Sequence, residues 1–380
     1  MKVCIAFLSI GIDIFAGIEN SLYNLALGLL SNNIEVCMYS GFLSGKGDTV
    51  GPIPVYRSSL VPSDLVEGDK TVRTELTENA SAIARELTRF IEQEAVTFLL
   101  VFDPLWGIVQ FTGAWKEIDC PLVLSLHVLN EYDLLLQAAT VPYILRRCVS
   151  KALKRKIEAI LPLRDLVVIP NSIDTLRFEP TDASKESKII LCNSRISPEK
   201  GITYLIEAFS YLIRRDPDLE LWLCEGDFPF GNKPKALREV RAAVRTHGIS
   251  SAVRFLPNLP WDEIPSVVQQ ASLIVLPTLY ETFGRAALEG LACGIPLVTT
   301  RVGNLPDLVG DSAILVEPRS PKQLYEAMYR VLSDEELYSR LSHQGPRVAA
   351  RYDNKLVAKQ LVDTFKEKII ASNDDSSTSR

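Results

Sequence analysis

The sequence predicts an α/β protein made of two doubly wound parallel sheets, followed by extra helices. Its 380 residues exceed what one hydrophobic core usually organises, so two domains are expected. Short β-rich apolar runs alternate with helix-length amphipathic stretches, the pattern of parallel sheets covered by helices on both faces. After residue 320 the alternation gives way to three helical stretches, 321–333, 335–350 and 353–371.

The candidate strands form one group in each half of the chain. They span residues 2–8, 34–39, 97–102, 121–126, 144–149 and 166–169, and then 188–193, 219–224, 252–256, 273–276, 296–299 and 313–316. Each group suffices for one Rossmann-like sheet, whose ligands lie beyond the carboxyl ends of the strands. Two such sheets facing each other would place one ligand in an inter-domain cleft.

A polar loop bracketed by Pro170 and Pro180 marks the domain boundary. We therefore predict one Rossmann-like domain over residues 1–180 and a second over 181–350. A C-terminal helix over 351–371 is expected to pack back on the first domain. The remaining residues, 372–380, are Ser- and Asp-rich and are predicted to be a disordered tail.

Composition excludes several classes of protein. Apolar residues make up 47% and charged residues 23%, so disordered and fibrous architectures are excluded. The net charge of −6 gives no global attraction to nucleic acid, and no groove-reading motif is present. The seven scattered cysteines indicate free thiols in a reducing cytoplasm. No apolar stretch reaches the ~18–20 residues of a membrane helix, so we predict a cytoplasmic protein.

Two other motifs have weaker functional interpretations. The basic stretch 146–156 would at most give peripheral contact with an anionic membrane, and a solvated helix face is the favoured interpretation. Asp216 and Asp218 form an Asp-x-Asp pair of the kind that can hold a metal ion, but they precede a strand, at the wrong end of a parallel sheet for chemistry. No metal site is predicted.

The segment 276–300 contains the strongest functional signal. A strand ends, a loop carries Glu281, a helix opens near Gly284, and Glu289 lies in the second turn of that helix. The first amides of a helix lack intrahelical acceptors and lie at its positive end, which favours phosphate binding. The amides expected to point outward are those of Phe283, Gly284 and Arg285.

A second strand-to-helix loop, residues 191–201, carries two cations, Arg195 and Lys200. Arginine can bind two oxygens of a diphosphate while lysine acts as a point charge, so the pair suits a diphosphate leaving group. In the alternative interpretation, Arg195 pairs with Glu199 and Lys200 merely ends a loop.

Taken in order, these motifs resemble a known family. The spacing Glu281-x7-Glu289, Arg195 with Lys200-Gly201, the stretch PNSID at 170–174 and Gly303 in VGNLPDLV closely resemble the retaining glycosyltransferases of family four. The resemblance is dense from about 165 to 330 and looser before that. It implies the GT-B fold of two facing Rossmann-like domains and a nucleotide-activated sugar as donor.

The resemblance also implies roles for individual residues. Arg195 and Lys200 would bind the donor diphosphate and act in catalysis. Glu281 and the backbone of 283–285 would hold sugar and phosphate, and Glu289 would bind the ribose hydroxyls. From the first domain, Gly17 would let a glycine loop approach the donor, and His127 would lie near the sugar, unless it is a structural strand-end histidine.

The activity implied is retaining transfer of a sugar, with UDP-sugar as the expected donor, to an acceptor hydroxyl on a small molecule, glycan or lipid. No metal and no cofactor are expected, since the protein's cations would stabilise the leaving group and the nucleotide-sugar is a substrate. Two alternatives stay open. One is a nucleotide-sugar epimerase, with His127 or Asp103 as its base, and the other is a non-catalytic partner subunit.

The sequence departs from the family pattern in places. Asn304 stands where a second glycine is usual, and we expect it to adopt the left-handed turn. Ala16 and Pro257 also replace common glycines. The acceptor pocket is expected to involve the loops 10–19, 103–107 and 127–133, where Phe15, Trp106 and Tyr132 favour a partly apolar acceptor.

Overall fold

The protein folds into two compact units, seen in a computed structural model. The structure describes residues 1–7, 17–41, 48–60, 74, 76–102, 108–163, 165–180, 187–225 and 233–378. The first unit comprises Met1–Ser172 with Asn354–Arg380, and the second comprises Ile173–Asp353. The second unit therefore begins before the predicted residue 181. The reason is that Ile173 bridges to Asp353 and its amide donates to the Tyr352 carbonyl at 2.9 Å.

The first unit contains one eight-stranded sheet. Its strands are β1 (Lys2–Phe7), β2 (Glu35–Ser40), β3 (Thr49–Val50), β4 (Ile53–Arg57), β5 (Phe98–Phe102), β6 (Leu122–Leu126), β7 (Leu145–Cys148) and β8 (Leu166–Val168). Their order is β3-β4-β2-β1-β5-β6-β7-β8, and every pairing is parallel except that of β3 with β4. The sequence analysis missed β3 and β4. Pro54 and Gly51, which normally interrupt a strand, are tolerated near the edge of a sheet.

The second unit contains a six-stranded, wholly parallel sheet. Its strands are β9 (Ile189–Cys192), β10 (Glu220–Cys224), β11 (Val253–Leu256), β12 (Leu273–Leu276), β13 (Leu297–Thr300) and β14 (Ile314–Val316). The order β11-β10-β9-β12-β13-β14 is the doubly wound order of a Rossmann sheet. It reverses between β9 and β12, and ligands of such sheets bind beyond the carboxyl ends of the strands at that point.

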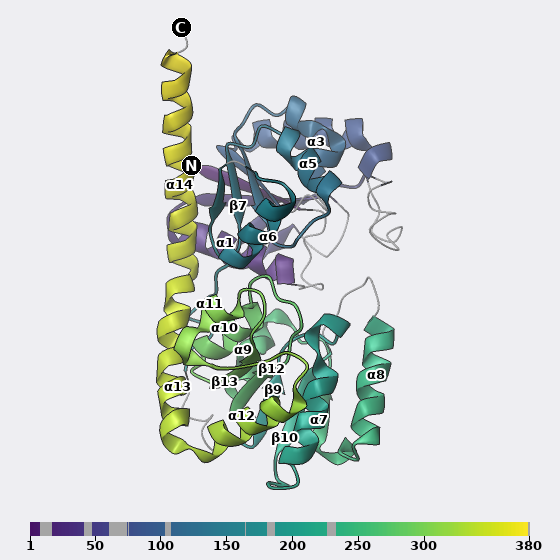
Figure 1. The fold of residues 1–380 in the computed structure, drawn as a ribbon. Coiled ribbons are helices and arrows are strands. Elements are labelled where there is room, and N and C mark those ends of the chain that lie inside the picture. The colour runs from purple at the N-terminus through teal and green to yellow at the C-terminus, as the bar shows by residue number, and fades with distance from the viewer. Residues whose placement is uncertain are drawn as a thin grey trace. The chain divides into compact units, whose positions relative to one another are not determined.

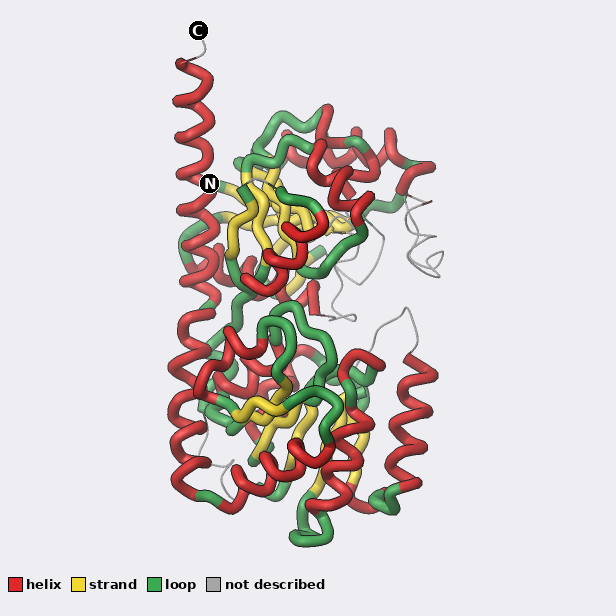
Figure 2. Tube along the Cα trace, in the orientation of Figure 1, coloured by secondary structure: helices red, strands yellow, loops and turns green. Residues whose placement is uncertain are grey.

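In each unit the sheet lies between helices (Figures 1 and 2). Those of the first unit include α1 (Gly17–Ser31), α3 (Ala80–Gln93), α4 (Ile108–Thr112), α5 (Tyr132–Thr140), α6 (Lys151–Ile160) and α14 (Asn354–Thr378). Those of the second include α7 (Ile202–Leu212), α8 (Lys233–Thr246), α9 (Ile264–Gln269), α10 (Arg285–Ala292), α11 (Leu305–Val309), α12 (Pro321–Ser333) and α13 (Glu335–Ala349). Among the described residues, no helix is both long and apolar enough to cross a bilayer.

The basic stretch 146–156 divides between two elements. Arg146 and Arg147 lie in β7, while the rest belongs to α6, which buries Ala152, Leu153 and Ile157. The lysines lie on the opposite, more exposed side of α6.

The last helix, α14, belongs to the first unit and packs on α1. Phe365 of α14 stacks on Phe98 of β5 with ring centroids 4.2 Å apart. The helix continues to Thr378, so the prediction of an unstructured tail from residue 372 is wrong over most of that stretch. Neither glycine nor proline occurs between Asn354 and Thr378, and nothing in the local sequence ends the helix.

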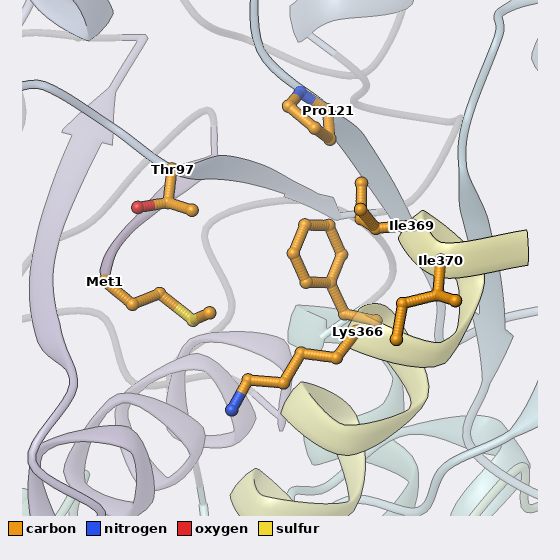
Figure 3. A pocket seen from close by; sticks show the side chains of 7 residues that line it. Met1, Thr97, Pro121, Lys366, Ile369 and Ile370 are labelled. Atoms are coloured by element: carbon orange, nitrogen blue, oxygen red, sulfur yellow. The ribbon is translucent and has the colours of Figure 1, made fainter. Parts of the chain in front are cut away.

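A pocket of about 390 Å³ lies where α14 meets the sheet (Figure 3). Met1, Thr97 and Pro121 line it, each directly before a strand, together with Phe365, Lys366, Ile369 and Ile370 of α14. The pocket therefore lies at the amino ends of β1, β5 and β6, away from the edge where parallel sheets bind their ligands.

We predict that Gly28→Ala destabilises the first unit by up to about 2 kcal/mol. A Cβ at Gly28 would lie 2.1 Å from the Asn354 carbonyl oxygen at the start of α14. The gain of up to about 1 kcal/mol in helix propensity is outweighed by an overpacking cost of about 1–3 kcal/mol. Thermal unfolding measures the change. The control is Ser31→Ala on the exposed end of α1, expected within about 0.5 kcal/mol of the parent. A more stable Gly28→Ala protein would contradict the close contact.

Candidate functional site

Two loops meet at the carboxyl ends of β9 and β12, where the sheet order of the second unit reverses. The Glu199 carbonyl oxygen accepts hydrogen bonds from the Leu279 amide at 2.7 Å and from the Thr278 hydroxyl at 3.1 Å. Gly201 has a φ of 61°, and a Cβ there would lie 2.3 Å from the Pro277 carbonyl oxygen. Only glycine lets the two loops come this close.

An ion pair joins the two loops. Lys200 Nζ lies 2.8 Å from Glu281 Oε2, and both side chains are 18% exposed. The other carboxylate oxygen, Oε1, accepts hydrogen bonds from the amides of Thr282 and Phe283 at 3.1 and 3.3 Å. Burial alone would raise the pKa of Glu281, but the Lys200 ammonium and these amides hold it below its ordinary value. Glu281 is therefore ionised at neutral pH.

Arg195 is oriented by an acid of its own loop. Its Nη2 lies 3.1 Å from Glu199 Oε1, which also accepts a hydrogen bond from the Ser197 hydroxyl at 2.6 Å. This is the pairing that the alternative interpretation predicts. The Arg195 side chain is still 39% exposed, so the pair is screened by solvent and only weakly stabilising.

Glu289 lies in α10 and is buried. Its Oε1 accepts a hydrogen bond from Arg285 Nη1 at 2.8 Å, and its Oε2 accepts one from Asn193 Nδ2 at 3.0 Å. Burial raises the pKa of Glu289, and Arg285 offsets this only in part. Each carboxylate oxygen can accept a second hydrogen bond, so these contacts leave room for ribose hydroxyls. The ribose contact itself stays a prediction.

The start of α10 differs in one respect from the prediction. Gly284 precedes the helix with a φ of 104° and no side chain caps the first turn, whose amides lack intrahelical acceptors. The Phe283 amide, however, donates to the Glu281 carboxylate and does not point outward. The Phe283 ring is buried and packs edge-to-face on Tyr352, with centroids 5.8 Å apart. The available amides are thus those of Gly284 and Arg285.

The loop after β13 supports Glu281 from behind. Gly303 has a φ of 55°, and a Cβ there would lie 1.8 Å from the Glu281 carbonyl oxygen. Asn304 is not left-handed as expected, since its φ is −87°. Gly303 makes the left-handed turn instead, and Asn304 acts through its side chain, whose Nδ2 donates to the Phe283 carbonyl at 2.9 Å.

The sequence analysis overlooked Asn193 and Thr278, which hold Glu289 and the Lys200 loop in place. Asn193 also donates to the Ala286 carbonyl at 3.2 Å and so fastens β9 to α10. The available signal was position, because Asn193 directly follows a buried strand at the ligand-binding edge of the sheet.

The predicted site residues Gly17 and His127 belong to the first unit. Gly17 is the first residue of α1, and His127 directly follows β6. His127 is buried, its Nε2 lies 2.9 Å from the Ser125 hydroxyl, and its ring stacks on Phe102 with centroids 4.8 Å apart. Burial and the nearby Arg147 charge hold the pKa of His127 well below its ordinary value. His127 is therefore neutral at physiological pH.

Several predicted acceptor residues lie outside the described residues. These are residues 10–16 and 103–107, with Phe15 and Trp106; the replaced glycine-loop position Ala16 and the candidate epimerase base Asp103 also lie there. Tyr132, at the start of α5, is described and exposed.

Within the part of the chain that the structure describes, no group of three His, Cys, Asp or Glu side chains could hold a metal ion. Asp216 of the Asp-x-Asp pair contacts Lys188 at 2.9 Å and accepts a hydrogen bond from the Asp218 amide. Both aspartates precede β10, at the amino edge of the sheet.

Comparison with known proteins identifies the second unit. Residues 174–348 match the model of the family described as glycosyl transferases group 1. These residues belong to that family. The group 1 segment nearly coincides with the second unit, Ile173–Asp353. The chain is 36% identical over 185 residues to D-inositol 3-phosphate glycosyltransferase of Corynebacterium urealyticum. This alignment covers 47% of this chain and 43% of that protein. The chain thus spans less than half the length of this curated relative.

Solved structures show the fold of both units. Sucrose-phosphate synthase of Thermosynechococcus elongatus aligns with a TM-score of 0.79 at 18% identity, over 97% of this chain and 99% of that chain. HepE of Anabaena, in complex with UDP and glucose, aligns with a TM-score of 0.77 at 19% identity, over 96% and 99%. The predicted fold class is confirmed: the group 1 segment is one of two Rossmann-like domains of the GT-B type.

We predict that Glu281→Gln lowers the stability of the second unit by about 1–3 kcal/mol at neutral pH, because it leaves Lys200 without its charged partner. The pKa of Glu281 is lower in the folded state than its ordinary value of 4.5. Its stabilising contribution is therefore complete above pH 4.5 and is lost as the pH falls through the folded-state pKa. Denaturant midpoints over a pH series should show the parent and variant converging below about pH 4.5.

Glu289→Gln provides a control of opposite sign. The pKa of Glu289 is raised, so the folded parent binds its proton more tightly than the unfolded chain and gains stability, relative to this variant, as the pH falls towards 4.5. The same slope for both variants would contradict the assigned environments.

Proposed function

We propose that the protein is a retaining glycosyltransferase that moves a sugar from a nucleotide-sugar, with UDP as the nucleotide, to an acceptor hydroxyl. The observation that carries the proposal is the Lys200–Glu281 ion pair beside the start of α10. It puts a cation, a carboxylate and helix-terminal amides at the point where the sheet order reverses. Membership of residues 174–348 in the group 1 family supports the same reaction class.

The leaving group would be a nucleoside diphosphate, whose negative charge grows as the glycosidic bond breaks. Lys200, Arg195 and the amides of Gly284 and Arg285 supply positive charge for it. Since Glu199 and Glu281 fix the two cations before the donor binds, little reorganisation is needed during the reaction. Glu281 keeps acceptor capacity for sugar hydroxyls, and Glu289 keeps it for the ribose.

The acceptor would attack from the face that the diphosphate leaves, with no covalent sugar–protein intermediate. The departing diphosphate oxygen then takes the proton of the acceptor hydroxyl, so that no general-base carboxylate is required. His127, neutral and held by Ser125, is assigned to the sugar side of the reaction and Gly17 to the approach of the first loop.

The protein's own cations neutralise the diphosphate in this proposal, so neither a metal ion nor a cofactor takes part. The choice of UDP is supported by HepE, whose structure contains UDP and glucose. The seven free cysteines support a reducing cytoplasmic location.

Arg195→Ala and Lys200→Ala should each lower kcat by about 10²–10³, because each removes positive charge from the developing diphosphate. Steady-state kinetics with a UDP-sugar donor measure the effect.

Lys188→Ala is the matched control. Lys188 also carries a salt bridge, to Asp216, but it lies at the amino end of β9. Its kcat should stay near that of the parent. We call Arg195 and Lys200 together the diphosphate clamp. If both site variants kept near-normal turnover, the proposed role of this clamp would be wrong.

Turnover should survive EDTA with less than about twofold loss, because side chains and backbone amides supply the stabilising charge. Loss of turnover that added Mg²⁺ or Mn²⁺ restores would refute metal independence.

Thermal shift with UDP, GDP, ADP and dTDP should give its largest increase in Tm with UDP. Product analysis should show transfer with the donor's anomeric configuration. An isomerised donor of unchanged mass would instead indicate an epimerase.

A further inference from the structure

Arg147 is a buried cation in the first unit, on β7. Its side chain is 1% exposed, the lowest exposure of a charged residue among those described as buried. It stands in register with Ser125 of β6, and Ser125 stands in register with Phe102 of β5. Residues paired across adjacent strands project from the same face of the sheet, so these three side chains form one row.

The guanidinium of Arg147 is only partly satisfied. Its Nε donates to the Ser125 hydroxyl at 2.7 Å, whereas its Nη1 is buried and has no hydrogen-bond partner among the described residues. No ion pair between Arg147 and another described residue is present. Burial lowers the pKa of Arg147 to about 10. An uncompensated buried charge is costly, and proteins normally pair it.

The neighbouring arginine, Arg146, differs in which of its nitrogens has an acceptor. Arg146 projects from the other face of β7, and its two terminal nitrogens donate to the carbonyls of Val141 and Tyr143 at 2.9 and 3.4 Å. Among the described residues, both terminal nitrogens of Arg146 thus have acceptors and its buried Nε has none, whereas Arg147 Nε has one and its Nη1 has none.

The position of Arg147 is that of a ligand-binding residue. Phe102 ends β5, His127 directly follows β6, and Arg147 is the penultimate residue of β7, so all three lie at the carboxyl edge of the sheet. The guanidinium lies 6.0 Å from the centroid of the Phe102 ring, on which His127 stacks. The Ser125 oxygen, which accepts a hydrogen bond from Arg147 Nε, also lies 2.9 Å from His127 Nε2. One bonded network therefore joins Arg147 to the predicted catalytic histidine.

We propose that Arg147 anchors an oxyanion subsite in the first unit, which binds a phosphoryl or carboxylate group of the acceptor. The oxyanion would compensate the buried charge and accept a hydrogen bond from Nη1. The identification of the oxyanion with the acceptor rests on the proposed glycosyltransferase function, while binding of the oxyanion itself does not. The acceptor is thus an anionic hydroxyl compound, such as a sugar or polyol phosphate, and not a neutral glycan.

The test measures binding without donor or turnover, so it is independent of the proposed reaction. The full chain carrying Arg195→Ala and Lys200→Ala serves as the parent, since the diphosphate clamp would itself bind phosphate. Thermal shift with inorganic phosphate should raise the Tm of this parent by about 2–5 °C near saturation. Acetate, the carboxylate probe, distinguishes the two oxyanion classes by which of them gives the larger shift.

Arg147→Met in the same parent should abolish the shift, and Arg146→Met, the matched control on the same strand, should retain it. Arg147→Lys keeps a charge without the planar fork and should weaken phosphate binding about tenfold. Persistence of the full shift in Arg147→Met, or no shift in the parent with either anion, would overturn the proposal.

The Tm in the absence of any oxyanion separates a binding role from a structural one. Replacing a buried charge that lacks a partner with an apolar side chain is neutral or stabilising, so Arg147→Met should unfold at the parent's Tm or above it. A structural arginine would give the reverse. A clearly lower Tm, or failure of Arg147→Met to fold, would therefore also overturn the proposal.

Discussion

The candidate site depends on one ion pair, between residues 81 positions apart. Lys200 and Glu281 come together because β9 and β12 are neighbours at the reversal of the sheet, so the loops that follow them leave from the same edge. The approach is possible only because Gly201 and Gly303 let backbone carbonyls lie where a Cβ would be. The glycines of the motif therefore act through the backbone, and the charged residues depend on them for their geometry.

The two glutamates of the motif show how position decides the chemistry of identical side chains. Glu281 faces an ammonium and two amides, and these lower its pKa in spite of burial. Glu289 is held by an arginine of its own helix and by the neutral amide of Asn193 after β9, and burial raises its pKa. The first is a fixed negative charge beside the proposed leaving group. The second fastens α10 to β9 and retains capacity to accept hydroxyl hydrogen bonds.

Both units are built on a mainly parallel sheet, but they satisfy their charges differently. In the second unit both predicted phosphate-binding cations are paired with glutamates, which compensate their charge and orient them before a ligand binds. In the first unit Arg147 has a serine as its hydrogen-bond partner, and no acid among the described residues pairs with it. A cation of the first kind exchanges its partners when a ligand binds, whereas one of the second kind gains a partner.

The sequence by itself determined the architecture and the identity of the charged residues. Apolar runs marked every strand of the two sheets except β3 and β4, and motif order pointed to Arg195, Lys200, Glu281 and Glu289, because strand periodicity and loop composition are local properties. Only the tertiary structure decided that Arg195 pairs with Glu199, that Phe283 donates its amide to Glu281, and that Gly303 and not Asn304 makes the left-handed turn. It also decided that Arg147 is buried and that no acid of the described ranges pairs with it. Those outcomes depend on which strands are neighbours and how closely their loops approach, and spacing along the chain does not encode either.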